Sequence, residues 1–166
     1  MRIGSAVLGS AIFFLVVPGA VAGLLPWLLS GGYAAMLQVT PLLTACCLIL
    51  IACGIGVLVY SFAHFALKGR GTPAPIAPTQ NLVVSGPYRF VRNPMYVAVL
   101  AIIFAQAVLS SSSSVFAYGL LVGAAMALFT YFYEEPTLSR VHGKGYDRYR
   151  AAVPGWWPRL TPWDDQ

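Results

Sequence analysis

The chain has 166 residues, of which 58% are hydrophobic and only 9% are charged. Soluble domains contain roughly 45–50% apolar and about 25% charged residues. This composition argues against a water-soluble globular protein. The net charge of +5 fits a membrane setting, because cations that flank membrane spans bind anionic headgroups.

Charged residues are absent from two long stretches, Ile3 to Leu67 and Asn93 to Tyr133. A helix needs about 20 apolar residues to cross a bilayer, so each stretch has room for two spans and a turn. Uncharged polar breaks at 30–32 and 110–114 place the turns. The sequence therefore predicts an all-α integral membrane protein with a single domain over residues 1–166. Its spans are expected at about 3–29, 41–67, 94–109 and 115–133.

The first apolar segment has a second interpretation. Arg2, the apolar residues after it and the small residues 20–22 resemble a secretory signal peptide. Apolar sequence continues beyond them through Trp27 and Leu28. This continuation favours a span that is retained, with a kink at Pro18.

All 10 Lys and Arg residues fall on one side of the four-span arrangement. Lys and Arg are enriched in cytoplasmic loops, so a multi-pass protein with its active site at the cytoplasmic face is expected. Beyond the last span, apolar side chains recur at helical spacing and predict a cytoplasmic interfacial helix. These residues are Leu138, Val141, Tyr146, Tyr149 and Val153.

Neither a metal nor a nucleic acid is expected as a ligand. Cys46, Cys47 and Cys53 lie within the second apolar segment at a spacing that fits no zinc or redox pattern. No part of the sequence predicts a basic, folded, soluble face of the kind that binds nucleic acid. Membrane lipids are the expected surroundings, and the oligomeric state is not predicted.

Two stretches carry residues suited to chemistry. The first runs from Gln80 to Tyr96 and ends in Asn93-Pro94, a pair that is also a common start of a helix. The second is Glu134-Glu135. Adjacent carboxylates there could simply complement a helix dipole. At a membrane boundary they are costly unless paired or hydrated, so binding of a cation is the alternative.

Together these stretches resemble the isoprenylcysteine carboxyl methyltransferase family and the related phospholipid N-methyltransferases. The shared pattern is Gly-x-Tyr-x-x-x-Arg-[His/Asn]-Pro-x-Tyr, two apolar spans, Glu-Glu, and then Leu-x4-Gly-x2-Tyr-x2-Tyr-x3-Val-Pro. The matching residues are Gly86, Tyr88, Arg92, Asn93, Pro94, Tyr96, Glu134, Glu135, Leu138, Gly143, Tyr146, Tyr149, Val153 and Pro154.

The resemblance implies an S-adenosylmethionine-dependent methyltransferase that acts on a lipophilic or membrane-associated small acceptor. It also implies a cofactor region of about 79–96 and 134–154. The residues carried over as cofactor-binding are Gln80, Asn81, Leu82, Val83, Tyr88, Asn93, Pro94, Met95, Tyr96, Glu134 and Glu135.

Two departures from the prenylcysteine enzymes leave the acceptor open. Asn93 replaces their usual histidine, and Thr130 stands where they resemble one another in having an arginine for the substrate carboxylate. A carboxylate, an amine or a thiol therefore all remain as acceptors. His64, near the cytoplasmic end of the second span, is a candidate general base, since histidine titrates near neutral pH. A polar anchor is its alternative role.

Two other functions compete with methyl transfer. One is a membrane-embedded NADPH-dependent reductase of the sterol reductase type, and the other is a non-catalytic four-helix scaffold. Paired Glu134 and Glu135 suit a cationic methyl donor. No basic cluster in the sequence is committed to a 2′-phosphate, which also favours the methyl donor.

The charge pattern predicts four spans with both termini in the cytoplasm. A reporter enzyme that is active only outside the cytoplasm is expected to stay inactive when fused after Gln166, because the positive side of the protein is retained inside. Activity of that fusion would contradict the topology.

Overall fold

The computed structural model describes residues 16–33, 39–68, 82 and 84–164, and every regular element in them is helical, with no strand. An apolar helix over Val16–Leu29 contains a π-helical turn, η1 (Ala20–Leu24), and α2 (Leu25–Leu29). The elements that follow are α3 (Pro41–Lys68), the 3₁₀ turn η2 (Gly86–Arg89), α4 (Pro94–Leu109), α5 (Ser113–Phe129), the π-helical turn η3 (Thr130–Glu134), α6 (Glu135–His142) and α7 (Lys144–Ala152).

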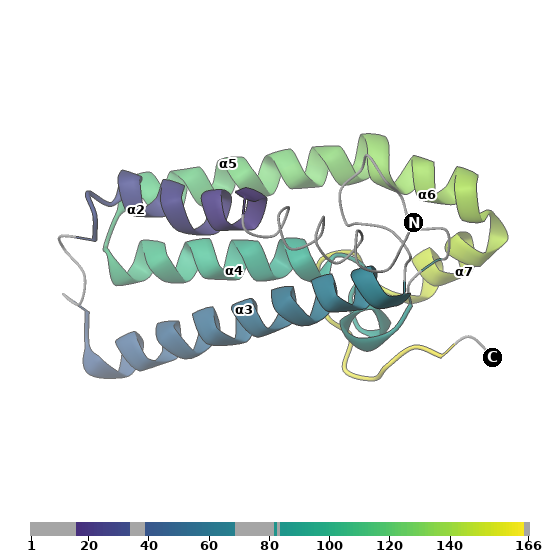
Figure 1. Ribbon diagram of the computed structural model, residues 1–166, viewed down its shortest axis with the longest axis horizontal. Helices are drawn as coiled ribbons and strands as arrows, with labels where there is room; N and C mark the ends of the chain where they lie inside the picture. Colours follow the sequence, from purple (N-terminus) through teal and green to yellow (C-terminus); the bar gives the residue numbers. More distant parts are fainter. Residues whose placement is uncertain (1–15, 34–38, 69–81, 83, 165–166) are drawn as a thin grey trace.

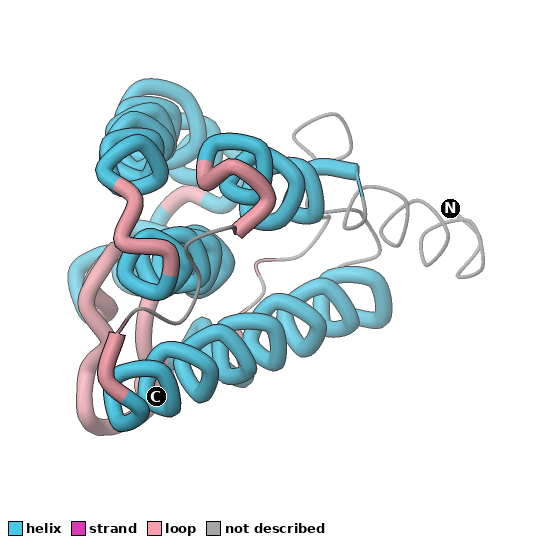
Figure 2. The backbone as a smooth tube through the Cα atoms, turned by 90° about the vertical axis from the view of Figure 1, so that its left-hand side faces the viewer, coloured by secondary structure: helices cyan, strands magenta, loops and turns pink. Residues whose placement is uncertain are grey.

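Helix α4 is the centre of the bundle. It packs against α3 on one side and against α5 and the first helix on the other (Figures 1 and 2). The core along α4 includes Ile103 and Leu109, both fully buried, and Val115 of α5 packs into it. The outer faces of α3 and α5 expose large apolar side chains such as Leu42 and Leu121, as expected for helices surrounded by lipid.

A proline shapes the first helix and ties it to α4. Pro26 has no N–H for the carbonyl of Ala22, and the chain opens into a π turn in which the Leu25 N–H bonds Ala20 O. The released carbonyls find side-chain donors instead. Gln106 Nε2 bonds Ala22 O at 2.7 Å, and Tyr118 Oη bonds Val21 O at 2.9 Å. Buried carbonyls in an apolar bundle need such partners.

The all-α class is confirmed for the described residues, and the predicted bounds of 94–109 match α4. Two helical stretches are long and apolar enough to cross a membrane, namely Pro41–Ala63 and Ser113–His142, whereas Val16–Leu29 and Pro94–Leu109 are apolar but shorter. The expectation of four spans therefore stays a prediction.

The last apolar helix does not end at Tyr133 as expected. It continues through η3 into α6. Residues beyond Tyr133 therefore form two helices, α6 and α7, where a single interfacial helix was predicted. The break falls at Gly143, whose φ of +54° and ψ of −135° suit glycine and few other residues. Trp156 and Trp163 follow in a segment that packs back onto the start of α4.

The crossing of α3 and α4 depends on a small residue at Gly54. A Cβ atom there would lie 2.8 Å from Ile102 Cγ1 and 3.3 Å from the carbonyl of Ala98. Gly54→Ala should therefore lower the stability by about 1–3 kcal/mol, as overpacking does. Gly56 has nothing within 4 Å of the same position, so Gly56→Ala is the matched control. Equal thermal unfolding of the two variants in detergent would show that the helices do not cross here.

Candidate functional site

A cavity of about 280 Å³ opens beside the N-terminal end of α4, between the first helix, α3 and α5. Most of its wall is apolar, and its polar groups come from the junction before α4 and from the end of η3. This mixture of apolar wall and few polar groups is typical of small-molecule sites. The lining residues are Val17, Pro18, Val21, Leu58, Phe62, Tyr88, Arg92, Asn93, Pro94, Met95, Tyr96, Val99, Met126, Phe129 and Glu134.

Glu134 brings a carboxylate to this cavity. Its Oε2 accepts a hydrogen bond from Tyr96 Oη at 3.1 Å. Glu134 is the last residue of the π turn η3, in which the Glu135 N–H bonds the carbonyl of Thr130. Pro136 comes directly after Glu135. Proline again removes a helical donor. Adjacent residues on a helix point about 100° apart, so Glu134 and Glu135 face different surroundings.

Asn93 offers the cavity an amide. It occupies the N-cap position of α4, but its side chain makes no capping hydrogen bond. Its Nδ2 is buried and has no hydrogen-bond partner among the described residues. A buried donor without a partner is costly, so a ligand acceptor in the cavity would satisfy it.

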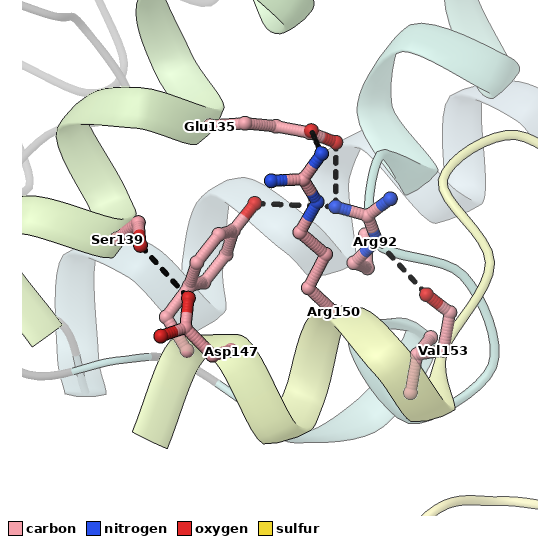
Figure 3. A network of polar contacts seen from close by, with 7 residues as sticks. Arg92, Glu135, Ser139, Asp147, Arg150 and Val153 are labelled. Atoms are coloured by element: carbon pink, nitrogen blue, oxygen red, sulfur yellow. Dashed lines mark hydrogen bonds and ion pairs between the residues drawn. The ribbon is translucent and has the colours of Figure 1, made fainter. Parts of the chain in front are cut away.

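Glu135 is held in two ion pairs (Figure 3), and it is not among the residues that line the cavity. Its side chain is 11% exposed; Oε1 lies 2.6 Å from Arg92 Nη1, and Oε2 lies 3.0 Å from Arg150 Nη2. Arg92 Nη1 also bonds Tyr146 Oη at 3.2 Å. The two adjacent acids thus have separate roles, because one faces the cavity and the other joins α6 to α7 and to the start of α4.

The tail after α7 is bonded to the junction before α4. Backbone N–H groups of Arg92 and Asn93 donate to the carbonyls of Pro154 and Gly155 at 2.9 and 3.2 Å. Arg92 Nε donates to the carbonyl of Val153 at 2.8 Å. These bonds fix the two cavity-lining residues Arg92 and Asn93 in place.

Tyr149 secures the same junction from α7. Its hydroxyl donates to the carbonyl of Tyr88 at 2.6 Å. Burial raises the pKa of Tyr149 well above its usual value, so the hydroxyl keeps its proton and remains a donor. Tyr88, which lines the cavity, is thereby held from the far side by α7.

The residues predicted to bind the cofactor fall into three groups. Six of them line the cavity together: Tyr88, Asn93, Pro94, Met95, Tyr96 and Glu134. Leu82 and Glu135 lie elsewhere, Leu82 against the Tyr146 and Tyr149 cluster and Glu135 in its ion pairs. Gln80, Asn81, Val83 and the side chain of the candidate base His64 lie outside the described residues.

Sequence reasoning missed the apolar half of the cavity. Val17 and Val21 of the first helix and Leu58 and Phe62 of α3 line it. Apolar residues in a span all look alike in sequence, so no pattern singles these out. Arg92 was part of the motif but carried no site assignment, because its partner Glu135 lies 43 residues further along the chain and meets it only in the folded structure.

The structure combines two helices that are long and apolar enough to cross a membrane with a mainly apolar cavity that contains the Glu134 carboxylate and the Asn93 amide. A family model described as phospholipid methyltransferase matches residues 42–145, well over half of the chain. The chain belongs to this family, within the superfamily that its motifs resemble, and membership implies a membrane methyltransferase. No curated protein matches the chain.

Glu135 should matter for stability because its removal leaves the mostly buried Arg92 without its partner. Glu135→Ala is expected to lower the free energy of unfolding by about 3–5 kcal/mol, the usual cost of breaking a buried pair. Asp164→Ala is the matched control, because Asp164 is exposed and pairs with Arg89 at the surface. That change should cost at most about 1 kcal/mol. Equal losses of thermal stability would contradict the distinction.

Proposed function

We propose that the protein transfers a methyl group from S-adenosylmethionine to a lipophilic or membrane-associated small acceptor. Family membership supports methyl transfer, and it does not support the reductase or scaffold alternatives. The observation that carries the cofactor assignment is the shared cavity of Glu134, Tyr96 and Asn93. These residues come from the two stretches that the motif singled out.

The polar groups of the cavity fit the polar end of this cofactor. An amino-acid end offers an ammonium and a carboxylate. Glu134 would bind the ammonium, and the buried Nδ2 of Asn93, which has no partner in the described part of the chain, would donate to the carboxylate. Aromatic faces also stabilise cations, and Tyr88, Tyr96 and Phe129 line the same wall.

S-adenosylmethionine supplies a methyl group on a positively charged sulfonium, ready for in-line displacement. The task left to the protein is to hold donor and acceptor about 3–3.5 Å apart. The apolar side chains Leu58, Val99 and Met126 exclude water around that meeting point. No covalent intermediate on the protein is required.

The charge of the cavity favours an acceptor without a negative group. Thr130 is buried and supplies no cation where the prenylcysteine enzymes resemble one another in having an arginine. Arg92 lines the cavity but is already bonded to Glu135 and to the carbonyl of Val153. An amine or a thiol on a lipophilic molecule therefore suits the site better than a carboxylate.

We further propose that the Val16–Leu29 and Pro94–Leu109 helices complete a four-span arrangement. The cavity would then open near the cytoplasmic face, because Arg89, Arg92 and Arg150 gather at that end of the bundle. Apolar walls on three helices would let an acceptor dissolved in the bilayer reach the site without crossing water.

Glu134→Gln should weaken binding of S-adenosylmethionine by about 10- to 150-fold. This range corresponds to losing a charge-assisted hydrogen bond of about 1.5–3 kcal/mol. Calorimetric titration of the purified protein measures the change. The fold should persist, because glutamine has the shape of glutamate and still accepts from Tyr96.

Asp147→Asn is the matched control, since it also removes one negative charge but at an exposed position bonded to Ser139. It should bind the cofactor like the native protein. Unchanged affinity in Glu134→Gln, with thermal unfolding intact, would rule out the assigned role of Glu134.

A further inference from the structure

Two large apolar side chains stand exposed in the tail after α7. Trp157 is 81% exposed and Leu160 is 99% exposed. Isolated exposed apolar residues are common and need no explanation. These two are three residues apart, with Arg159 between them, and both lie beyond the residues that match the family model.

Their exposure does not come from a loose chain end. The backbone on both sides is bonded to the junction before α4: Gly155 O accepts from Asn93, Arg159 N–H donates to Phe90 O at 2.9 Å, and Trp163 N–H donates to Arg89 O at 2.9 Å. Trp157 and Leu160 are therefore presented by a segment that is fixed at several points.

The segment lies beside one end of a helix that is long and apolar enough to cross a membrane. Gly86 lies so close to the ring of Tyr60 that a Cβ atom there would overlap it, and Tyr60 lies within the apolar stretch Pro41–Ala63. The junction and the tail bonded to it therefore sit beside the end of that stretch, as Figure 1 shows for the yellow tail next to α3. In membrane proteins, tryptophan is enriched at the membrane–water interface and arginine in the cytoplasmic loops next to the spans.

The same segment reaches the cavity wall. Trp156 stacks on Tyr96, with ring centroids 6.3 Å apart and planes at 23°. Tyr96 in turn donates to Glu134. Trp156, the residue directly before the exposed Trp157, thus contacts the tyrosine that donates to the Glu134 carboxylate.

We propose that Trp157 and Leu160 insert into the cytoplasmic headgroup region of the bilayer and that this contact positions Trp156 against Tyr96. The occupant is lipid, because the segment is bonded to the junction beside the end of the candidate span Pro41–Ala63 and combines exposed apolar side chains with Arg159. The affinity of the cavity for its ligand then depends on the membrane contact. This second step rests on the proposed binding of S-adenosylmethionine.

The lipid contact is tested directly by fluorescence in nanodiscs of phosphatidylcholine and phosphatidylglycerol, with or without brominated phosphatidylcholine. Bromine quenches tryptophan only at close range, so Trp157→Phe should remove part of the quenched signal of the native protein. Trp163→Phe is the control, since Trp163 packs on Tyr149 and should contribute little to quenching. An unchanged quenched fraction in Trp157→Phe would overturn the contact and leave water or a protein partner at this surface.

The coupling is tested by affinity for S-adenosylmethionine in the same nanodiscs. Trp157→Ser with Leu160→Ser should weaken binding by about fivefold or more, the lower end of common coupling between sites. Trp157→Phe with Leu160→Phe keeps the apolar contact and should stay within about twofold of native. Both pairs change only exposed side chains.

Equal affinities in the serine and phenylalanine pairs would refute the coupling. Failure of the native protein to bind S-adenosylmethionine would instead refute the proposed function, and the quenching experiment would still decide the lipid contact.

Discussion

The ion pair and hydrogen bonds of the mostly buried Arg92 guanidinium are the interactions on which the site depends. The guanidinium bonds Glu135 at the start of α6, Tyr146 in α7 and the carbonyl of Val153. The backbone N–H of Arg92, just before α4, donates to the carbonyl of Pro154. Segments far apart in sequence are thereby held around one charge. Because a buried charge without its partners is strongly unfavourable, these segments are expected to assemble together or not at all.

Two prolines lie next to the π turns of the bundle. Pro26 opens the π turn η1, and its released carbonyls bind Gln106 and Tyr118. Pro136 follows the π turn η3, which ends at the pair of acids. π turns often occur at functional sites. Here the first ties a helix to the core, and the second presents Glu134 to the cavity.

Much of the fold followed from simple features of the sequence. The charge-free stretches predicted the helical membrane class, and Asn93-Pro94 marked the start of α4. The charged residues at 134–135 suggested that the last helix ends at Tyr133, whereas the helix continues into α6 and Glu135 pairs with cations from other segments; the end of the span itself stays a prediction. A helix boundary decided by distant partners leaves no local signal.

The site was predicted less completely than the fold. Six residues of the motif line the same cavity. The motif could identify them because it combines residue types at a spacing that apolar spans do not show. The motif did not predict that Glu134 faces the cavity while Glu135 forms ion pairs. That distinction depends on the direction of each side chain and on Arg150, which lies outside the motif. It also gave no sign of the hydrogen bonds between the tail and 89–93, because backbone bonds place little demand on residue type.

The π turn before the two acids has a consequence for insertions and deletions. One residue added to or removed from a helix rotates everything beyond it by about 100°. The π turn Thr130–Glu134 already holds one residue more than an α-helical turn, so a deletion between Thr130 and Tyr133 would be absorbed by closing it to an ordinary turn, whereas a deletion in the α-helical part of α5 would rotate both acids. The π turn is thus a place where this helix tolerates the loss of one residue without turning Glu134 away from the cavity, and α5 before it offers no such place.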